Sequence, residues 1–181
     1  IETSGRSVGR FPEGDEDIYV LDQPTSGASN VYTYSTPVVI NEVHFHPPYI
    51  PADEKCDSQC SDAHQWVELF NRSEDAVDLT GWKITNGIRY TFEPGTTLGA
   101  GGYLVVASSL ADFSAIHEGV ENAVGDWSGR LNHSTDTINL RDSLGNRVDR
   151  VVYGDGGASN DEDPENGVDD RTFRGSAWPS G

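Results

Sequence analysis

Seven short runs rich in β-branched and aromatic residues constrain the fold of this chain more than any other feature of its sequence. They are 38–45, 64–71, 76–86, 89–94, 101–108, 136–142 and 146–154, and Gly, Pro, Asn or Asp borders most of them. Most follow the run before them by roughly 8 to 15 residues, a spacing typical of antiparallel sandwiches. The sequence therefore predicts an all-β antiparallel β-sandwich.

Alternation inside the runs supports this prediction. In the run 64–71, Trp66, Glu68 and Phe70 fall on one face of an extended strand and the residues between them fall on the other. One segment, 109–119, instead spaces its apolar residues at helical intervals and ends in glycine. We expect one short helix there, in a connection between strands.

The net charge of the chain disfavours some classes of binding partner. The 181 residues carry 12 basic and 30 acidic side chains, a net charge of −18, which disfavours binding to nucleic acid. No apolar run approaches the roughly 20 residues that cross a membrane. The chain begins at Ile1 without methionine, so we expect an excised piece of a longer protein. Its only two cysteines lie close together, which hints at an oxidising compartment and thus an extracellular or cell-surface location.

The order of several motifs is more specific than composition. They read INE (40–42), WVELFN (66–71), VDLTGWKI (77–84), YTFEPGTTLGAGGYLVV (90–106) and INLRDSLGNRVDRVVYG (138–154). In this order they resemble a lamin-tail domain of the bacterial type. The resemblance implies an Ig-like antiparallel sandwich of about seven to nine strands over residues 37–154. Glu93 before the Pro-Gly turn, Ala100 in place of a proline and a longer 46–64 loop depart from the family pattern.

The flanking segments suggest a longer architecture. SVGRFPEG (7–14) and QPTSGASN (23–30) are similar to the segment that closes a bacterial lamin-tail domain, with Ser26 replacing the second proline. We therefore interpret residues 1–36 as the end of an upstream module or a docked linker. Residues 155–181 form an acidic C-terminal segment. The parent protein would then be a large, exported tandem.

The loop between the first two strands gathers most of the metal-ligand chemistry. The candidate zinc ligands are His44, His46, Cys56, Cys60 and His64. His44 and His46 alternate onto one face of a strand, as zinc or copper ligands do, and hydrolase-type chemistry would follow. Competing with zinc is a disulfide between Cys56 and Cys60 that closes a small loop in an exported protein, and free thiols are a third state.

A second metal hypothesis concerns calcium. The oxygen ligands would be Asp161, Asp163, Glu165 and Asp169. Their alternation approximates a calcium loop, but Pro164 interrupts it, Asn166 replaces the usual glycine and Thr172 the usual glutamate. A solvated acidic loop is the competing interpretation. No other cofactor is expected.

No nucleophile elbow, zinc-protease helix or phosphate loop is present. Glu42 and Glu68 form a candidate carboxylate pair if the first two strands are neighbours, although hydrogen bonding to a strand end or loop explains such residues as well. Tyr49 and Trp178 are candidate contact residues in irregular regions. The sequons at 71–73 and 132–134 are frequent accidental matches.

The sequence thus predicts a module without enzymatic activity: an interaction or spacer domain of a large exported multidomain bacterial protein. Its expected partners are neighbouring domains, another surface protein or a glycan. One alternative is calcium-assisted binding of carbohydrate or a cell surface. The other is the zinc site at His44 and His46.

Overall fold

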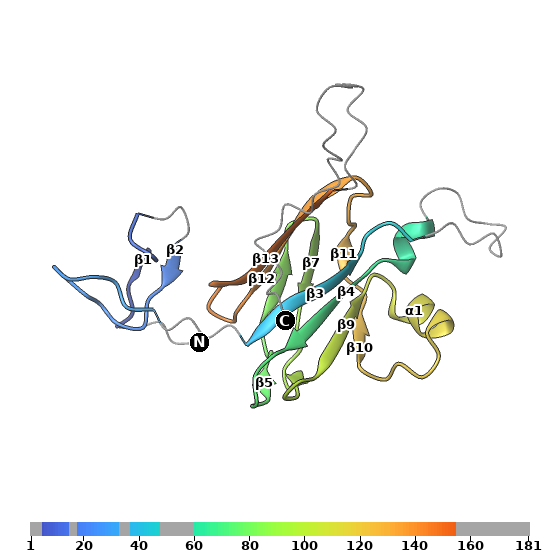
Figure 1. Ribbon diagram of the computed structural model, residues 1–181, viewed down its shortest axis with the longest axis horizontal. Coiled ribbons are helices and arrows are strands. Elements are labelled where there is room, and N and C mark those ends of the chain that lie inside the picture. The colour runs from blue at the N-terminus through green and yellow to red at the C-terminus, as the bar shows by residue number, and fades with distance from the viewer. Residues whose placement is uncertain (1–4, 15–17, 33–36, 48–59, 155–181) are drawn as a thin grey trace, which may run out of the picture.

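The computed structural model describes residues 5–14, 18–32, 37–47 and 60–154, which fold mainly into two packed β-sheets (Figure 1). One sheet has the order β10-β9-β4-β3 and the other the order β11-β7-β6-β12-β13. The first contains β3 (Val38–His44), β4 (Trp66–Asn71), β9 (Tyr103–Ala107) and β10 (Ala123–Gly125). The second contains β6 (Lys83–Thr85), β7 (Ile88–Thr91), β11 (Ser128–Gly129), β12 (Thr135–Arg141) and β13 (Arg147–Gly154). The predicted sandwich is confirmed.

The core lies between the sheets and follows the alternation of the sequence. On β4, Val67, Leu69 and Asn71 are buried, while Trp66, Glu68 and Phe70 are half-buried on the outer face. The inward residues of both sheets join Trp82 and Trp127 in one hydrophobic cluster. Because successive side chains of a strand point to opposite faces, this single register fixes which residues face solvent.

Most expected strands form, but the run 76–86 splits in two. β5 (Val77–Asp78) pairs with β8 (Thr97–Leu98) in a separate two-stranded sheet, and β6 begins at Lys83. Gly81 lies between them with φ 73°, a left-handed conformation that glycine adopts without strain. The chain therefore turns a corner at Gly81 and changes sheet.

The predicted helix is α1 (Leu110–Ile116). The Ser109 side chain accepts a hydrogen bond from the Asp112 N–H and caps the first turn. Phe113 packs on Val105 and Ala107 of β9, so the helix covers part of the outer face. It connects β9 to β10, the pair that runs parallel.

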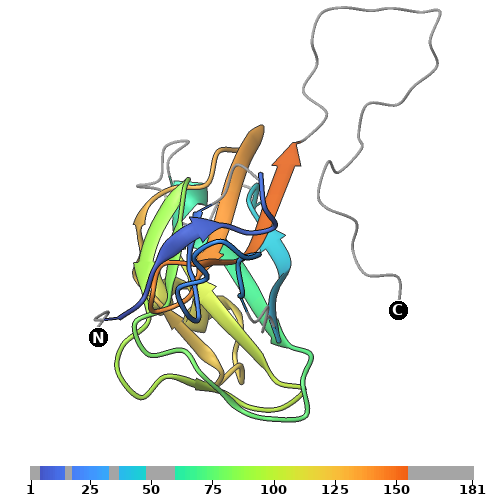
Figure 2. The ribbon, with the colours of Figure 1, turned by 90° about the vertical axis from the view of Figure 1, so that its left-hand side faces the viewer.

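Residues 5–14 and 18–32 form a small unit of their own, here called the N-terminal unit. In it β1 (Val8–Arg10) and β2 (Ile18–Val20) pair antiparallel. Tyr19 and Leu21 are buried, and Asn30 Nδ2 donates to the Arg10 carbonyl, which closes the unit. Figure 2 views the molecule from this side.

One asparagine joins the N-terminal unit to the sandwich. Asn146, 1% exposed, precedes β13; its Oδ1 accepts from the Val20 N–H at 2.6 Å. Its Nδ2 donates to the Val20 carbonyl at 3.2 Å. The side-chain amide thus binds Val20 as a neighbouring strand would. No helix in the described part of the chain is long and apolar enough to span a membrane.

Candidate functional site

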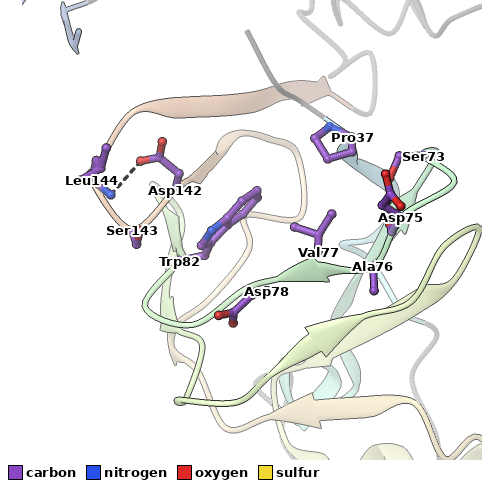
Figure 3. Close-up of a pocket in the computed structure, with 10 residues that line it drawn as sticks. All are labelled: Pro37, Ser73, Asp75, Ala76, Val77, Asp78, Trp82, Asp142, Ser143 and Leu144. Atoms are coloured by element: carbon purple, nitrogen blue, oxygen red, sulfur yellow. Dashed lines mark hydrogen bonds between the residues drawn. The ribbon is translucent and has the colours of Figure 1, made fainter. Parts of the chain in front are cut away.

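A pocket of about 560 Å³ lies at the end of the sandwich where β4 and β12 finish (Figure 3). Three segments enclose it: the chain from β4 into β5, the corner that leads into β6, and the turn between β12 and β13. It is lined by Pro37, Ser73, Asp75, Ala76, Val77, Asp78, Trp82, Asp142, Ser143 and Leu144. Among the residues that the structure describes, the lining contains three aspartates and no basic residue. The pocket therefore combines an apolar interior with negative charge.

A buried amide shapes the first segment. Asn71, the last residue of β4, is fully buried, and its Nδ2 donates to the carbonyls of Asp75, Leu98 and Gly99. Its Oδ1 accepts from the N–H and hydroxyl of Ser73. These bonds hold the chain from Ser73 to Asp75 against the loop after β8. They also place the first sequon asparagine inside the protein.

The corner before β6 supplies the aromatic wall. The Gly81 N–H donates to the Phe92 carbonyl, and the Trp82 N–H donates to the Leu79 carbonyl. This backbone arrangement turns the Trp82 indole into the pocket beside Val77, as Figure 3 shows. Trp82 is 9% exposed, so only a small part of its ring is available at the pocket surface.

The turn between β12 and β13 forms the opposite wall. Oδ1 of Asp142 accepts from the N–H groups of Leu144 (2.9 Å) and Asn146 (2.8 Å). The Asp142 N–H in turn donates to the Asn146 carbonyl. These bonds order a short hairpin turn of the kind that aspartate favours. The same turn presents Asp142 to the pocket and Asn146 to the N-terminal unit.

The pocket carboxylates have no basic partner among the described residues. Asp78 Oδ1 accepts from both the hydroxyl and the N–H of Thr80, and these bonds lower the pKa of that carboxyl below its ordinary value. Asp78 is therefore ionised at neutral pH. In the described part of the chain Asp78 and Asp142 each take their donors on Oδ1, which leaves the second oxygen of each for a ligand. The arrangement suits a cation on an apolar stem.

The three histidines proposed as zinc ligands lie near the other end of the sandwich. His44 stacks on Trp66 with ring centroids 5.2 Å apart, and burial lowers its pKa. His46 instead stacks on His133 at 4.6 Å. The two histidines thus enter different contacts. The residues that the structure describes include no group of three or more His, Cys, Asp or Glu placed to hold a metal ion.

His46 belongs to a cluster that the sequence did not indicate. His133 Nε2 lies 2.8 Å from Asp62 Oδ1, and Arg130 Nη1 lies 3.5 Å from Asp62 Oδ2. Asp62 stands in the 3-10 helix η1 (Cys60–His64), whereas Arg130 and His133 come from the loop before β12. The cluster, here called the histidine end, brings two loops together around Asp62.

The carboxylate pair Glu42 and Glu68 does lie on neighbouring strands, directly opposite each other. The ladder is interrupted between Ile40 and Glu42, so Asn41 forms a bulge in β3. Asn41 Nδ2 donates to Glu68 Oε1 at 2.7 Å. This bond ties the bulge to the adjacent strand, in agreement with the structural interpretation of these residues.

Other predicted residues fall outside the described part of the chain. These are Tyr49, Cys56, the four calcium ligands Asp161, Asp163, Glu165 and Asp169, and Trp178. Cys60 is described in its backbone only. The disulfide and the calcium site accordingly stay predictions.

Sequence reasoning did not find the pocket. Trp82 belongs to the core and Asp142 orders a turn, and both also line the pocket. What was missed is that β5 leaves the sandwich and opens a space beside them. The signal available was the glycine at position 81 inside an apparently continuous strand.

The two packed sheets, with a pocket at one end and loops at the other, define an Ig-like all-β domain. A family model described as Lamin Tail Domain matches residues 33–155. Since this match covers more than half of the sequence, the chain belongs to the lamin tail domain family, a family of non-enzymatic Ig-like domains. Comparison with curated proteins gave no significant match.

Proposed function

We propose that this domain is a non-catalytic interaction module that binds a basic side chain of a partner protein in the acidic pocket. The observation that carries the proposal is the set of Asp75, Asp78 and Asp142 around Trp82, without a basic partner in the described part of the chain. Carboxylates that gather around an aromatic, apolar hollow are suited to arginine or lysine.

The chemistry of such a side chain matches the pocket in two ways. Its aliphatic stem would pack on Val77 and Leu144, while its charged head would lie at the pocket rim, where the carboxylates are. A cation over the exposed part of Trp82 would add about 0.5–2 kcal/mol. Arginine has the further advantage of donating two parallel hydrogen bonds to one carboxylate.

The charge of the whole chain favours the same class of partner. A net charge of −18 attracts basic segments over a distance and raises their rate of association at low salt. Nucleic acid is disfavoured for the same reason. The negative electrostatic potential of this chain therefore favours basic protein segments as partners.

The wider setting that we propose is a large exported multidomain bacterial protein. The resemblance of residues 7–30 to the closing segment of a lamin-tail domain supports a tandem arrangement, and the two close cysteines support export. The docked N-terminal unit is compatible with a tandem, because it brings an upstream segment next to the pocket end.

A peptide titration tests the pocket. The probe is the fluorescein-labelled, acetylated and amidated peptide Thr-Val-Arg-Val-Thr, compared with the same peptide carrying citrulline, which keeps the shape of arginine without its charge. We expect the arginine peptide to bind at least about tenfold more tightly, because it alone can pair with the carboxylates. Fluorescence anisotropy at 50 mM and 300 mM NaCl measures both affinities.

Variants assign the binding to the pocket. Asp78→Asn and Asp142→Asn keep the Oδ1 acceptors of the turn and should each weaken binding about three- to tenfold. Glu118→Gln, which removes one exposed charge beyond α1, is the matched control and should change little. Equal binding of the arginine and citrulline peptides would disprove the proposal. Binding that appears only with added Ca²⁺, or binding of a glycan instead, would favour the calcium-assisted alternative.

A further inference from the structure

The strand that borders the pocket has one unoccupied edge. In the described part of the chain β5 pairs only with β8, with Val77 opposite Leu98 and Asp78 opposite Thr97. The pocket is lined by β5 and the residues before it, and by no residue of β8. The edge of β5 that faces away from β8 therefore faces the pocket.

The hydrogen bonds next to this ladder show which residue of β5 directs its backbone N–H and C=O away from β8. The Leu79 N–H donates to the Thr96 carbonyl, which continues the pairing beyond the two strands. In an antiparallel ladder every second residue bonds the partner strand and the residues between bond the other side. Since Leu79 and Val77 face β8, the N–H and C=O of Asp78 point away from it. Neither group has a hydrogen-bond partner among the described residues.

We propose that the partner binds as an added strand: an extended basic segment pairs with the open edge of β5 through Asp78 and places an arginine or lysine side chain against Trp82. This inference rests on the proposed function and specifies how the partner backbone is held. Main-chain pairing would supply affinity without reading sequence, and the acidic pocket would select the basic residue.

The charges on this edge agree with such a partner. Asp75 and Asp78 lie on the same segment as the open edge, and Asp142 lies on the turn across the pocket. Charged side chains on an exposed edge discourage pairing with an unsuited strand. Here the repulsion falls on acidic segments, including further copies of this chain, whereas a basic segment is attracted. The edge is thus open to one class of strand.

Backbone N-methylation of the arginine peptide tests the pairing. A methyl group removes one N–H donor and blocks the approach of a neighbouring strand at that residue, but it leaves the side chains in place. We expect affinity to fall about tenfold or more when methylation removes the N–H that bonds the Asp78 carbonyl, and to change less than about threefold at the neighbouring residues. A methylated Arg peptide and its unmethylated parent are compared by anisotropy on the whole chain.

Hydrogen exchange gives a second measurement that does not depend on the peptide series. The Asp78 amide should exchange at least about tenfold more slowly when the arginine peptide is bound, because it gains a partner. The amide of Glu118 is the control and should not change. Tight binding with no difference among the methylated positions and no protection at Asp78 would overturn strand addition while leaving the pocket proposal intact. If the arginine peptide fails to bind better than the citrulline peptide, the proposed function fails first.

Discussion

The two ends of strand β4 are built in the same way and used differently. Gln65, just before the strand, and Asn71, its last residue, are both fully buried amides. Gln65 Nε2 donates to the carbonyls of Phe45 and Leu131, and its Oε1 accepts from the Leu131 N–H. Asn71 holds the Ser73–Asp75 segment and the loop after β8 by the same chemistry. Each amide fixes the loops at its own end.

The charges at the two ends differ. At the histidine end, Asp62 has Arg130 and His133 as partners. At the pocket end, Asp75, Asp78 and Asp142 surround a hollow and have no basic partner in the part of the chain that the structure describes. The Asp62 carboxylate already has neighbours within the fold, whereas the pocket carboxylates remain available to a basic ligand. The comparison separates an end with internal contacts from the end at which we propose binding.

The largest effect should come from removing either amide. Gln65→Ala and Asn71→Ala each leave buried carbonyls without donors, so we expect losses of about 2–4 kcal/mol in the free energy of unfolding. Urea denaturation measures both. Asn122→Ala, which removes an exposed amide that donates to the Tyr103 carbonyl, is the control and should cost less than about 1 kcal/mol. Equal losses in all three variants would contradict the role given to the buried amides.

Asn146→Ala should act next most strongly and only on the pocket end. The variant removes both bonds to Val20, and we expect the N-terminal unit to lose about 1–2 kcal/mol of its docking free energy. Amide exchange at Tyr19 and Val20 should then quicken, while exchange in β4 stays unchanged. Quickening in both regions alike would show that the unit and the sandwich unfold together.

Neutralising one carboxylate at each end should change the free energy of unfolding by a smaller amount, and by different amounts at the two ends. Asp62→Asn should cost about 0.5–1 kcal/mol, because it weakens the contacts with Arg130 and His133. Asp78→Asn should change the free energy of unfolding by less than about 0.5 kcal/mol, because the amide keeps its bonds from Thr80 and one repulsive charge is lost. Thermal unfolding at low salt compares them, and the reverse order would refute the assignment of the two ends.

The smallest effect concerns pH and His44. Burial lowers the pKa of His44, so the folded state binds its proton less readily than the unfolded state does. The free energy of unfolding should therefore fall as the pH drops through the ordinary range of histidine, about 6.5, toward the lower pKa of the folded state. Melting temperatures at pH 7.5 and 5.5 measure it. His44→Gln should reduce this dependence, and an unchanged slope would assign it to other groups.

The sequence predicts those structural features that depend on neighbouring residues and misses those that depend on tertiary contacts. The face of Trp66, Glu68 and Phe70, the helix and the last two strands follow from periodicity and turn residues, and all were predicted. The splitting of 76–86 was not, since Gly81 was the one local signal for it and the separation of β5 from β6 depends on tertiary pairing. The very short strands β8, β10 and β11 carry too few residues for a periodic signal.

The sites show the same limit. His44 and His46 alternate in sequence as ligands would, yet one stacks on Trp66 and the other on His133. Their partners come from distant segments that no local spacing reveals. The pocket likewise needs Asp78 and Asp142 to meet, and only the fold brings these segments together. The sequence shows which residues have suitable side chains, but not which residues they contact in the folded domain.

The amide of Asn146 has a mechanical consequence. A pull on the N-terminal end of the chain would strain its two bonds to Val20 before the force reached β3. Those bonds would break and reform while the ladder between β3 and β4 stayed whole. Because the amide bonds the backbone of Val20 and not its side chain, these hydrogen bonds would not depend on which residue stands at position 20. In a chain of such domains, the N-terminal unit of each domain would undock under force before the sandwich unfolded.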